Sequence, residues 1–323
     1  MVDIDRRDRL YINARDAIDM GITDYSTGSP TRAASGVRNF YSGVLLLAKY
    51  VLAVKAPAAD IMSVIGKDFE PVLSKDGDVD LVQKGHRTID FEEIGARLKD
   101  FGIEIDQKAL RDLNRIRTDL EHFYTNEDPE AIREVMAKAF PVAISLFHLA
   151  DKDPRDELGT TWDVMMEMQE VYEKKLARCR SSFKDVEWQS KTLANAPYNC
   201  PRCHSDLVIQ DDAQWSKTQD ADVRCLACRE RIDAQKAMER ALELHFDAES
   251  YLAAVEGGDD PIGTCPECGI DTYILSDDEV GCANCGLVLE ECGRCHTGLT
   301  PWNVDMEKHG LCSYCANLFR KDD

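Results

Sequence analysis

The placement of cysteine is the feature that most limits how this chain can fold. None of its 13 cysteines precedes Cys179, and twelve of them form six Cys-x2-Cys pairs after residue 199. A Cys-x2-Cys turn points two thiolates at one metal ion, and two such pairs a dozen or two residues apart complete a tetrahedral zinc site. The charged first residues, Met1 to Asp8, carry no export signal. We therefore expect a cytoplasmic protein whose cysteines bind metal rather than form disulfides.

Taken in order, the six pairs make three quartets, and each quartet resembles a zinc ribbon or a treble-clef knuckle. We expect about three structural zinc ions, because four thiolates leave no open position for a catalytic metal. Gly269 and Gly286, each directly after a second cysteine, suit a tight turn with positive φ. The expected ligands are Cys200, Cys203, Cys225 and Cys228, then Cys265, Cys268, Cys282 and Cys285, and finally Cys292, Cys295, Cys312 and Cys315.

The pairing of the last eight cysteines leaves two alternatives. A cross-braced arrangement, as in RING-like domains, would join Cys265 and Cys268 to Cys292 and Cys295. RING-like spacing brings the second and third ligand pairs closer together and includes a histidine, so we prefer sequential modules. His204 and His296 directly follow a cysteine pair and compete as ligands, although four cysteines per site suffice. Cys179 has no such pair and is expected to be a buried thiol.

The charge of the chain limits its partners. The formal net charge is −21, and residues 199–323 contain 11 Lys and Arg against 25 Asp and Glu. Phosphate backbones are held by clustered cations, so this balance argues against modules that coat nucleic acid. We expect the zinc modules to contact a protein partner. A DNA-binding regulator is a weaker alternative.

The first 180 residues have helical periodicity and no alternating strand pattern. They predict an all-α bundle followed by the small zinc modules. The expected helices are 3–20, 31–54, 58–69, 91–101, 109–124, 131–149 (with a kink or break at Pro141) and 162–180; 21–30, 73–85 and 151–158 are expected loops. The helix 31–54 has a wide apolar surface and is expected at the centre of the core. No run reaches the 18 uncharged apolar residues of a membrane span, so no membrane partner is expected.

These elements predict a division into six parts. An all-α domain covers 1–183 and a linker covers 184–198. The first zinc ribbon covers 199–230, a connecting helix lies within 231–258, and the remaining ribbons cover 259–290 and 291–323. The connecting helix is amphipathic from Ile232 to Val255 and begins at the end of the first ribbon.

The stretch from Ala109 to Tyr124 sorts into two helical faces. An apolar stripe is made by Leu110, Leu113, Ile116, Leu120 and Phe123, and a mainly cationic stripe by Lys108, Arg111, Arg115, Asp119 and His122. Arg115 and His122 lie on nearly the same side, roughly 10 Å apart along the helix axis. Arg117 lies about 140° round the helix from His122. A solvated helix face that pairs with carboxylates is the plainer interpretation of this pattern.

This stretch resembles the HEPN superfamily of small all-α domains. Arg117-Thr-Asp-Leu-Glu-His122 fits the R-x4-H form of the R-x4-6-H signature, and Arg115 to His122 fits the x6 form, so the motif arginine stays ambiguous. Tyr124 fits the R-x4-H-x-Y extension of toxins that are paired with a nucleotidyltransferase. Residues 88–98 are similar to the connecting segment of several members. Thr118 departs from the usual asparagine after the arginine.

The resemblance implies a metal-independent endoribonuclease of prokaryotic defence or toxin–antitoxin systems. His122 would serve as general base or acid, Arg117 or Arg115 would stabilise the pentacovalent phosphate, and Asp119 would orient the imidazole. Members commonly act as dimers, so a homodimer with an RNA substrate is expected. The alternative is a non-catalytic dimeric adaptor or sensor whose ribbons bind a protein, which Thr118 and the acidic composition favour.

Overall fold

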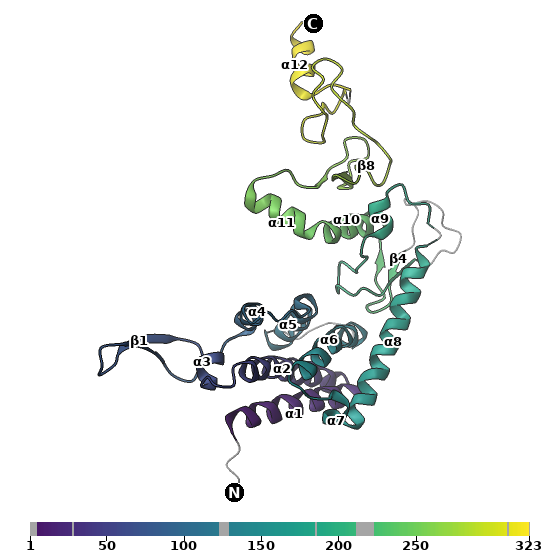
Figure 1. Cartoon of the computed structure of the whole chain (residues 1–323). Helices are drawn as coiled ribbons and strands as arrows, with labels where there is room; N and C mark the ends of the chain where they lie inside the picture. The colour runs from purple at the N-terminus through teal and green to yellow at the C-terminus, as the bar shows by residue number, and fades with distance from the viewer. Residues whose placement is uncertain are drawn as a thin grey trace. The chain divides into compact units, whose positions relative to one another are not determined.

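The chain forms two compact units, Met1–Glu173 and Lys174–Asp323. The computed structural model describes residues 5–27, 29–122, 129–184, 186–210, 223–308 and 310–322, with the side chains of 30, 119–122, 129, 321 and 322 left out (Figure 1). The boundary between the units falls inside helix α8 (Thr160–Ser182), which carries the chain from one unit to the other.

The first unit is rich in helices, as predicted. Its elements before α8 are α1 (Arg6–Ser26), α2 (Pro30–Lys55), α3 (Ile61–Ile65), β1 (Phe69–Leu73), β2 (Val79–Gln83), α4 (Phe91–Asp100), α5 (Gln107–His122), α6 (Pro129–Leu149) and α7 (Pro154–Leu158). α6 is one helix that contains Pro141. The expected charged loop 151–158 is wrong in part, because Asp153 caps the short helix α7 by accepting a hydrogen bond from the Arg155 N–H.

Helix α2 lies at the centre of the first unit, as its wide apolar surface predicted. It packs against α1, α3, α4, α5 and α6. Val37, Phe40, Val44, Leu47 and Val51 are fully buried. The Phe40 ring meets Phe140 of α6 edge-on, with centroids 5.4 Å apart. One small bundle therefore covers the apolar surface of this helix within a single chain.

The same helix has a further property that follows from its composition. Among the described helices, the part of α2 from Thr31 to Lys55 is long and apolar enough to cross a membrane, judged by length and composition only. Of its most apolar 18-residue window, 61% is buried inside the protein. The core helix of a soluble protein passes the same test, so this helix alone is weak evidence for a membrane span.

Helices α1 and α2 pack at close range through glycines. A Cβ added at Gly43 would lie 2.7 Å from the backbone nitrogen of Ile18, and one added at Gly36 would lie 2.7 Å from the carbonyl oxygen of Gly21. Gly21 itself would meet the backbone of Phe40 at 2.5 Å. The predicted loop 21–30 is therefore wrong in its first part: α1 continues to Ser26, because Gly21 lies at a close helix contact and not at a helix end, and α2 begins at Pro30.

The expectation of an all-α first unit is wrong at one element. Strands β1 and β2 form an antiparallel hairpin, with Leu73 opposite Val79 and Pro71 opposite Leu81. β2 lies in the predicted loop 73–85, whereas β1 begins at Phe69, the last residue of the predicted helix 58–69. Figure 1 shows the hairpin projecting from the helices of its unit. Leu73 is 74% exposed and Leu81 is 69% exposed. A hairpin that buries neither face needs no alternation of apolar and polar residues, so its sequence carries no pattern that predicts strands.

The second unit contains the end of α8, then short strands and helices around the cysteines. Its further elements are α9 (Lys191–Asn195), β3 (Val208–Gln210), β4 (Val223–Cys225), β5 (Arg231–Ile232), α10 (Ala234–His245), α11 (Asp247–Glu256), β6 (Ile262–Gly263), β7 (Tyr273–Leu275), β8 (Val280–Cys282) and α12 (Ser313–Asp322). The strands make two three-stranded antiparallel sheets in the orders β3-β4-β5 and β6-β7-β8.

Helix α10 joins the parts of the second unit. Its Leu242 packs in one cluster with Leu193 of α9 and Ile274 of β7, and all three are fully buried. The segment predicted as a linker, 184–198, thus contributes α9 to a core. The single helix predicted from Ile232 to Val255 is wrong in detail: α10 ends at His245, and α11 starts after Phe246.

The glycine contact leads to a stability prediction. Gly43→Ala should lower the free energy of unfolding by about 1–3 kcal/mol, because its Cβ meets backbone that cannot move aside. Gly95→Ala on α4 is the matched control. Its Cβ would meet only the end of the Gln107 side chain, so the intrinsic helix preference of alanine should leave stability unchanged or raised. Urea unfolding of both variants measures the difference; equal midpoints would contradict the close-packing account.

Candidate metal centres and the arginine helix

The cysteine pairs share one backbone turn. In five of the six pairs the N–H of the first cysteine donates to the carbonyl five residues later, at 2.8–2.9 Å. The donors and acceptors are Cys200 and Ser205, Cys225 and Glu230, Cys265 and Ile270, Cys282 and Leu287, and Cys292 and Thr297. This turn folds the chain back after the second cysteine, so both thiols point to the same side.

The residue after the second cysteine has positive φ in these five turns. Gly269 has φ of 73° and Gly286 has φ of 76°, which confirms the turns predicted there. His204, Arg229 and His296 occupy the same position, with φ of 58–62°. The two histidines therefore supply the positive-φ residue of the turn. They are not members of the clusters of metal-binding side chains. The role of Arg229 was missed, although its place directly after Cys228 was a usable signal.

The sixth pair is built differently. Cys312 and Cys315 lie at the start of α12, where the next residue, Ala316, donates to the Cys312 carbonyl as part of the helix. The Cys315 N–H points to the Cys312 sulfur at 3.4 Å, and the Cys312 N–H to the Cys292 sulfur at 3.3 Å. Backbone N–H groups at a helix start stabilise thiolates.

The twelve sulfurs gather into three groups of four, and the groups are the sequential ones. Within each group all sulfurs lie within 4.8 Å of one another. Sulfur pairs of 3.6–3.8 Å occur in all three, for example Cys200 to Cys228, Cys268 to Cys282, and Cys295 to Cys312. Zinc–sulfur bonds of about 2.3 Å in a regular tetrahedron separate sulfurs by about 3.8 Å, whereas a disulfide needs about 2.05 Å. Each group fits one structural zinc ion.

The thiols of one group shift each other's acidity in opposite directions. Hydrogen bonds from Cys203 and Cys225 hold the pKa of the Cys200 thiol at about 4, whereas contacts with Cys200 and Cys225 raise the pKa of Cys203. In the third group, N–H groups of Cys312 and Cys295 lower the pKa of Cys292 to about 6, and burial raises that of Cys315 to about 12. Crowded thiolates repel one another, and a divalent cation removes that repulsion.

The metal groups also anchor the apolar core of the second unit. Tyr273 and Leu289 lie in one buried cluster with cysteines of the second and third groups. The Leu289 N–H donates to the Tyr273 hydroxyl at 2.9 Å. The modules are too small to enclose a large apolar core, so binding of metal at these groups would be coupled to their folding.

Helix α5 has the two faces that the sequence predicted. Leu110, Leu113 and Ile116 are buried, while Arg115 and Arg117 are partly exposed. The guanidinium carbon of Arg117 lies 5.5 Å from the ring centroid of Tyr41 on α2, a cation–π distance. Thr118 donates its hydroxyl hydrogen to the Asn114 carbonyl at 2.8 Å.

The other predicted catalytic groups are not described. The backbone of Asp119 and His122 belongs to α5, but their side chains lie outside the described part of the chain, and so does the whole of Tyr124. Of the predicted catalytic set, the described side chains are those of Arg115 and Arg117, on one helix two residues apart.

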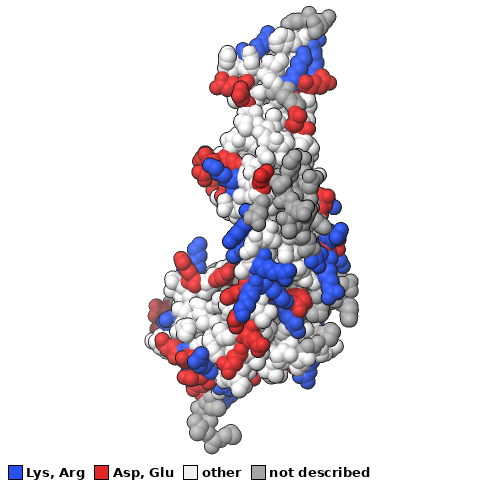
Figure 2. Space-filling view, turned by 90° about the vertical axis from the view of Figure 1, so that its right-hand side faces the viewer, with Lys and Arg blue, Asp and Glu red and all other residues white. Residues whose placement is uncertain are grey.

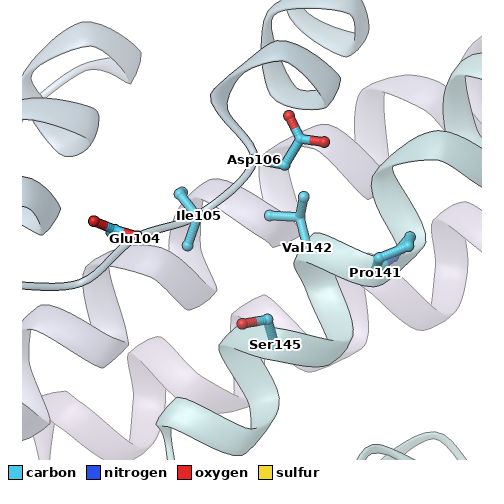
Figure 3. A pocket seen from close by; sticks show the side chains of 6 residues that line it. All are labelled: Glu104, Ile105, Asp106, Pro141, Val142 and Ser145. Atoms are coloured by element: carbon cyan, nitrogen blue, oxygen red, sulfur yellow. The ribbon is translucent and has the colours of Figure 1, made fainter.

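The first unit also has a surface hollow of about 350 Å³ between the 104–106 segment and α6. Figure 3 shows the carboxylates of Glu104 and Asp106 pointing in different directions. Asp106 accepts hydrogen bonds from the N–H groups of Lys108 and Ala109 at the start of α5. Two carboxylates that do not converge, one of them capping a helix, do not make a catalytic pair.

Comparison with models of protein families, with curated proteins and with solved structures gives no match for this chain. The assignment of the metal groups rests on the sulfur distances and turn geometry described above.

The sulfur geometry predicts three tightly bound zinc ions per chain. Elemental analysis of the purified protein should give about three zinc ions and no iron. Cys265→Ser should reduce this to about two and unfold the second module locally, while circular dichroism still reports the helices of the first unit. Cys179→Ser is the control, because this buried thiol belongs to no metal group. A coloured iron cluster, or unchanged zinc in Cys265→Ser, would contradict the assignment.

Proposed function

We propose that this protein is a HEPN-like, metal-independent endoribonuclease of a prokaryotic defence or toxin–antitoxin system. The observation that supports it is the amphipathic helix α5. Leu110, Leu113 and Ile116 of its apolar stripe are buried, and its partly exposed arginines lie one to two turns before His122, the last residue described in this helix. The spacing on this helix matches both forms of the arginine–histidine signature.

The proposed chemistry uses the 2′-hydroxyl of the RNA as nucleophile. His122 takes the 2′-hydroxyl proton as the 2′-oxygen bonds to phosphorus and the bond to the 5′-oxygen breaks. The leaving 5′-oxygen gains a proton from an imidazolium. The products carry a 2′,3′-cyclic phosphate and a 5′-hydroxyl. An arginine, Arg117 or Arg115, would stabilise the added negative charge of the phosphorane.

The zinc modules take no part in this chemistry. A zinc ion held by four thiolates has no position left for water or a phosphate oxygen. The modules would instead hold the second unit together and recognise a protein partner. Cleavage is therefore expected to continue when a chelator is present.

A homodimer suits the geometry of the motif. Arg117 is about 140° from His122 on an ideal helix, so an arginine from a second copy could complete each site. α2 is covered within one chain, and the hairpin face of Leu73, Val79 and Leu81 offers an exposed apolar surface for a contact between copies.

The second candidate function is a non-catalytic adaptor. The third zinc module favours it, because Trp302, Met306 and Tyr314 are exposed there, and such side chains commonly anchor protein interfaces. The packing of Arg117 over Tyr41 also favours it, since an arginine with a structural contact is less available to a phosphate.

The two candidates differ in one experiment. Under the proposed function, His122→Ala should slow cleavage of total RNA by about 10²–10⁴-fold, because a general acid–base group is lost. RNA with 2′-O-methyl groups should resist cleavage. Arg115→Gln and Arg117→Gln then identify the motif arginine. A melting temperature for each variant separates loss of the Arg117–Tyr41 contact from loss of catalysis.

Three kinds of outcome would count against the proposed ribonuclease. Equal degradation by wild type and His122→Ala would indicate a contaminating nuclease. If neither the wild-type protein nor His122→Ala degrades RNA, and Tyr124 carries no nucleotidyl group, the proposed ribonuclease activity is ruled out. Cleavage that stops with EDTA, or products with 3′-hydroxyl ends, would require a different chemistry.

A further inference from the structure

The second unit contains a pocket that none of the preceding assignments uses. Its volume is about 480 Å³, and it lies between the end of α8, the segment 194–198 and the first zinc module. Its buried lining includes Cys179, Phe183, Ala196 and Val208, whereas Arg180, Lys184 and Ala194 in the same lining are exposed. The pocket therefore has an apolar floor and opens to solvent on its cationic side.

The floor is held firmly in place. The Phe183 and Tyr198 rings are stacked with centroids 4.5 Å apart and planes within 9°. The Tyr198 hydroxyl donates to the Leu193 carbonyl at 3.2 Å, and the Ser182 hydroxyl accepts from the Gln210 N–H at 3.0 Å. The last contact ties the end of α8 to strand β3 of the first zinc module. A pocket formed by such groups is preformed.

The cations of the pocket stand out in an acidic protein. From Lys174 to Lys184 the chain has five Lys and Arg and no Asp or Glu, against a net charge of −21 for the whole chain. Figure 2 views the molecule from the side of α8 and shows Lys and Arg gathered on this face. Within the described residues, neither Arg180 nor Lys184 has an ion-pair partner. Both are available to an anion, and their neighbours add to the local positive potential.

We propose that this pocket binds a nucleoside monophosphate unit. Its phosphate would pair with Arg180 and Lys184, and its base would lie against the apolar floor at Phe183. The lining also contains the carboxylate of Asp206. It would repel a second phosphate and would accept hydrogen bonds from ribose hydroxyls or a base amino group. The lining suits a ligand that has an anionic group, a flat ring and several hydrogen-bond donors. A nucleotide has all three, whereas a polyphosphate or a fatty acid does not.

This inference does not depend on RNA cleavage. The same unit can arrive as a free mononucleotide or as one residue of a single strand. Binding of four probes to the full zinc-loaded chain, measured by calorimetry or competition, distinguishes these sources. The probes are AMP, UMP, inorganic phosphate and a 12-residue RNA with 2′-O-methyl groups. The 2′-O-methyl strand cannot undergo the proposed cleavage, so binding and catalysis are read separately.

We expect AMP or UMP to bind at least tenfold more tightly than inorganic phosphate, which lacks the ring. Arg180→Gln with Lys184→Gln should weaken binding at least tenfold, because both phosphate contacts are lost. If the strand is the source, this double variant should also reduce the slope of log affinity against log salt by about 1.4, since each phosphate contact in a single strand contributes about 0.7.

Two further variants separate the pocket from general charge. Lys99→Gln with Lys236→Gln removes the same net charge at exposed positions of α4 and α10, and it should change affinity by less than twofold. Ala194→Phe adds a ring at an exposed lining position and should block binding with the zinc content unchanged. The proposal is overturned if wild type binds neither nucleotide nor strand, if both double variants weaken binding equally, or if Ala194→Phe binds normally.

Discussion

The four-cysteine groups are the constraint on which the second unit depends, and each of the three fits one structural zinc ion. Its strands are two or three residues long, and one of its apolar clusters is built largely from the cysteines themselves. Such segments cannot enclose a core large enough to offset the entropy of ordering the chain. Metal ions in the three groups would supply the missing interactions, since each would join two cysteine pairs that lie apart in sequence. The first unit needs no such device, because α2 lets five helices pack around one buried stripe.

The metal groups could be predicted from sequence because their chemistry is local. A Cys-x2-Cys turn carries its own backbone geometry, and Gly269 and Gly286 signal the positive φ that the turn needs. The same local reasoning gave a wrong end for the first helix at Gly21. A glycine in a helix reads as a break when only neighbours in sequence are known, yet its purpose is set by Phe40, nineteen residues away. The exposed hairpin of β1 and β2 was missed for a related reason, since period-two alternation appears only where one face of a strand is buried.

Function was less accessible from sequence than fold. The arginine–histidine helix was predicted with its apolar and cationic faces, and Leu113 and Ile116 are buried as expected. The cation–π contact of Arg117 with Tyr41 could not be predicted, because it depends on how α5 packs against α2. The cationic pocket escaped notice for a similar reason. Arg180 and Lys184 lie in a charge run that is visible in the sequence, but the floor beside them also needs Tyr198, which stacks on Phe183 from fifteen residues later.

The most direct test of this account is the coordination of the metal itself. X-ray absorption at the zinc edge of the purified chain reports the ligand atoms and their distances for all three ions. The account predicts four sulfur ligands at about 2.3 Å per zinc, with no nitrogen or oxygen ligand. A nitrogen contribution would instead assign His204 or His296 to a site. An oxygen contribution would mean an open zinc capable of catalysis, which would contradict the structural role given to the metals here.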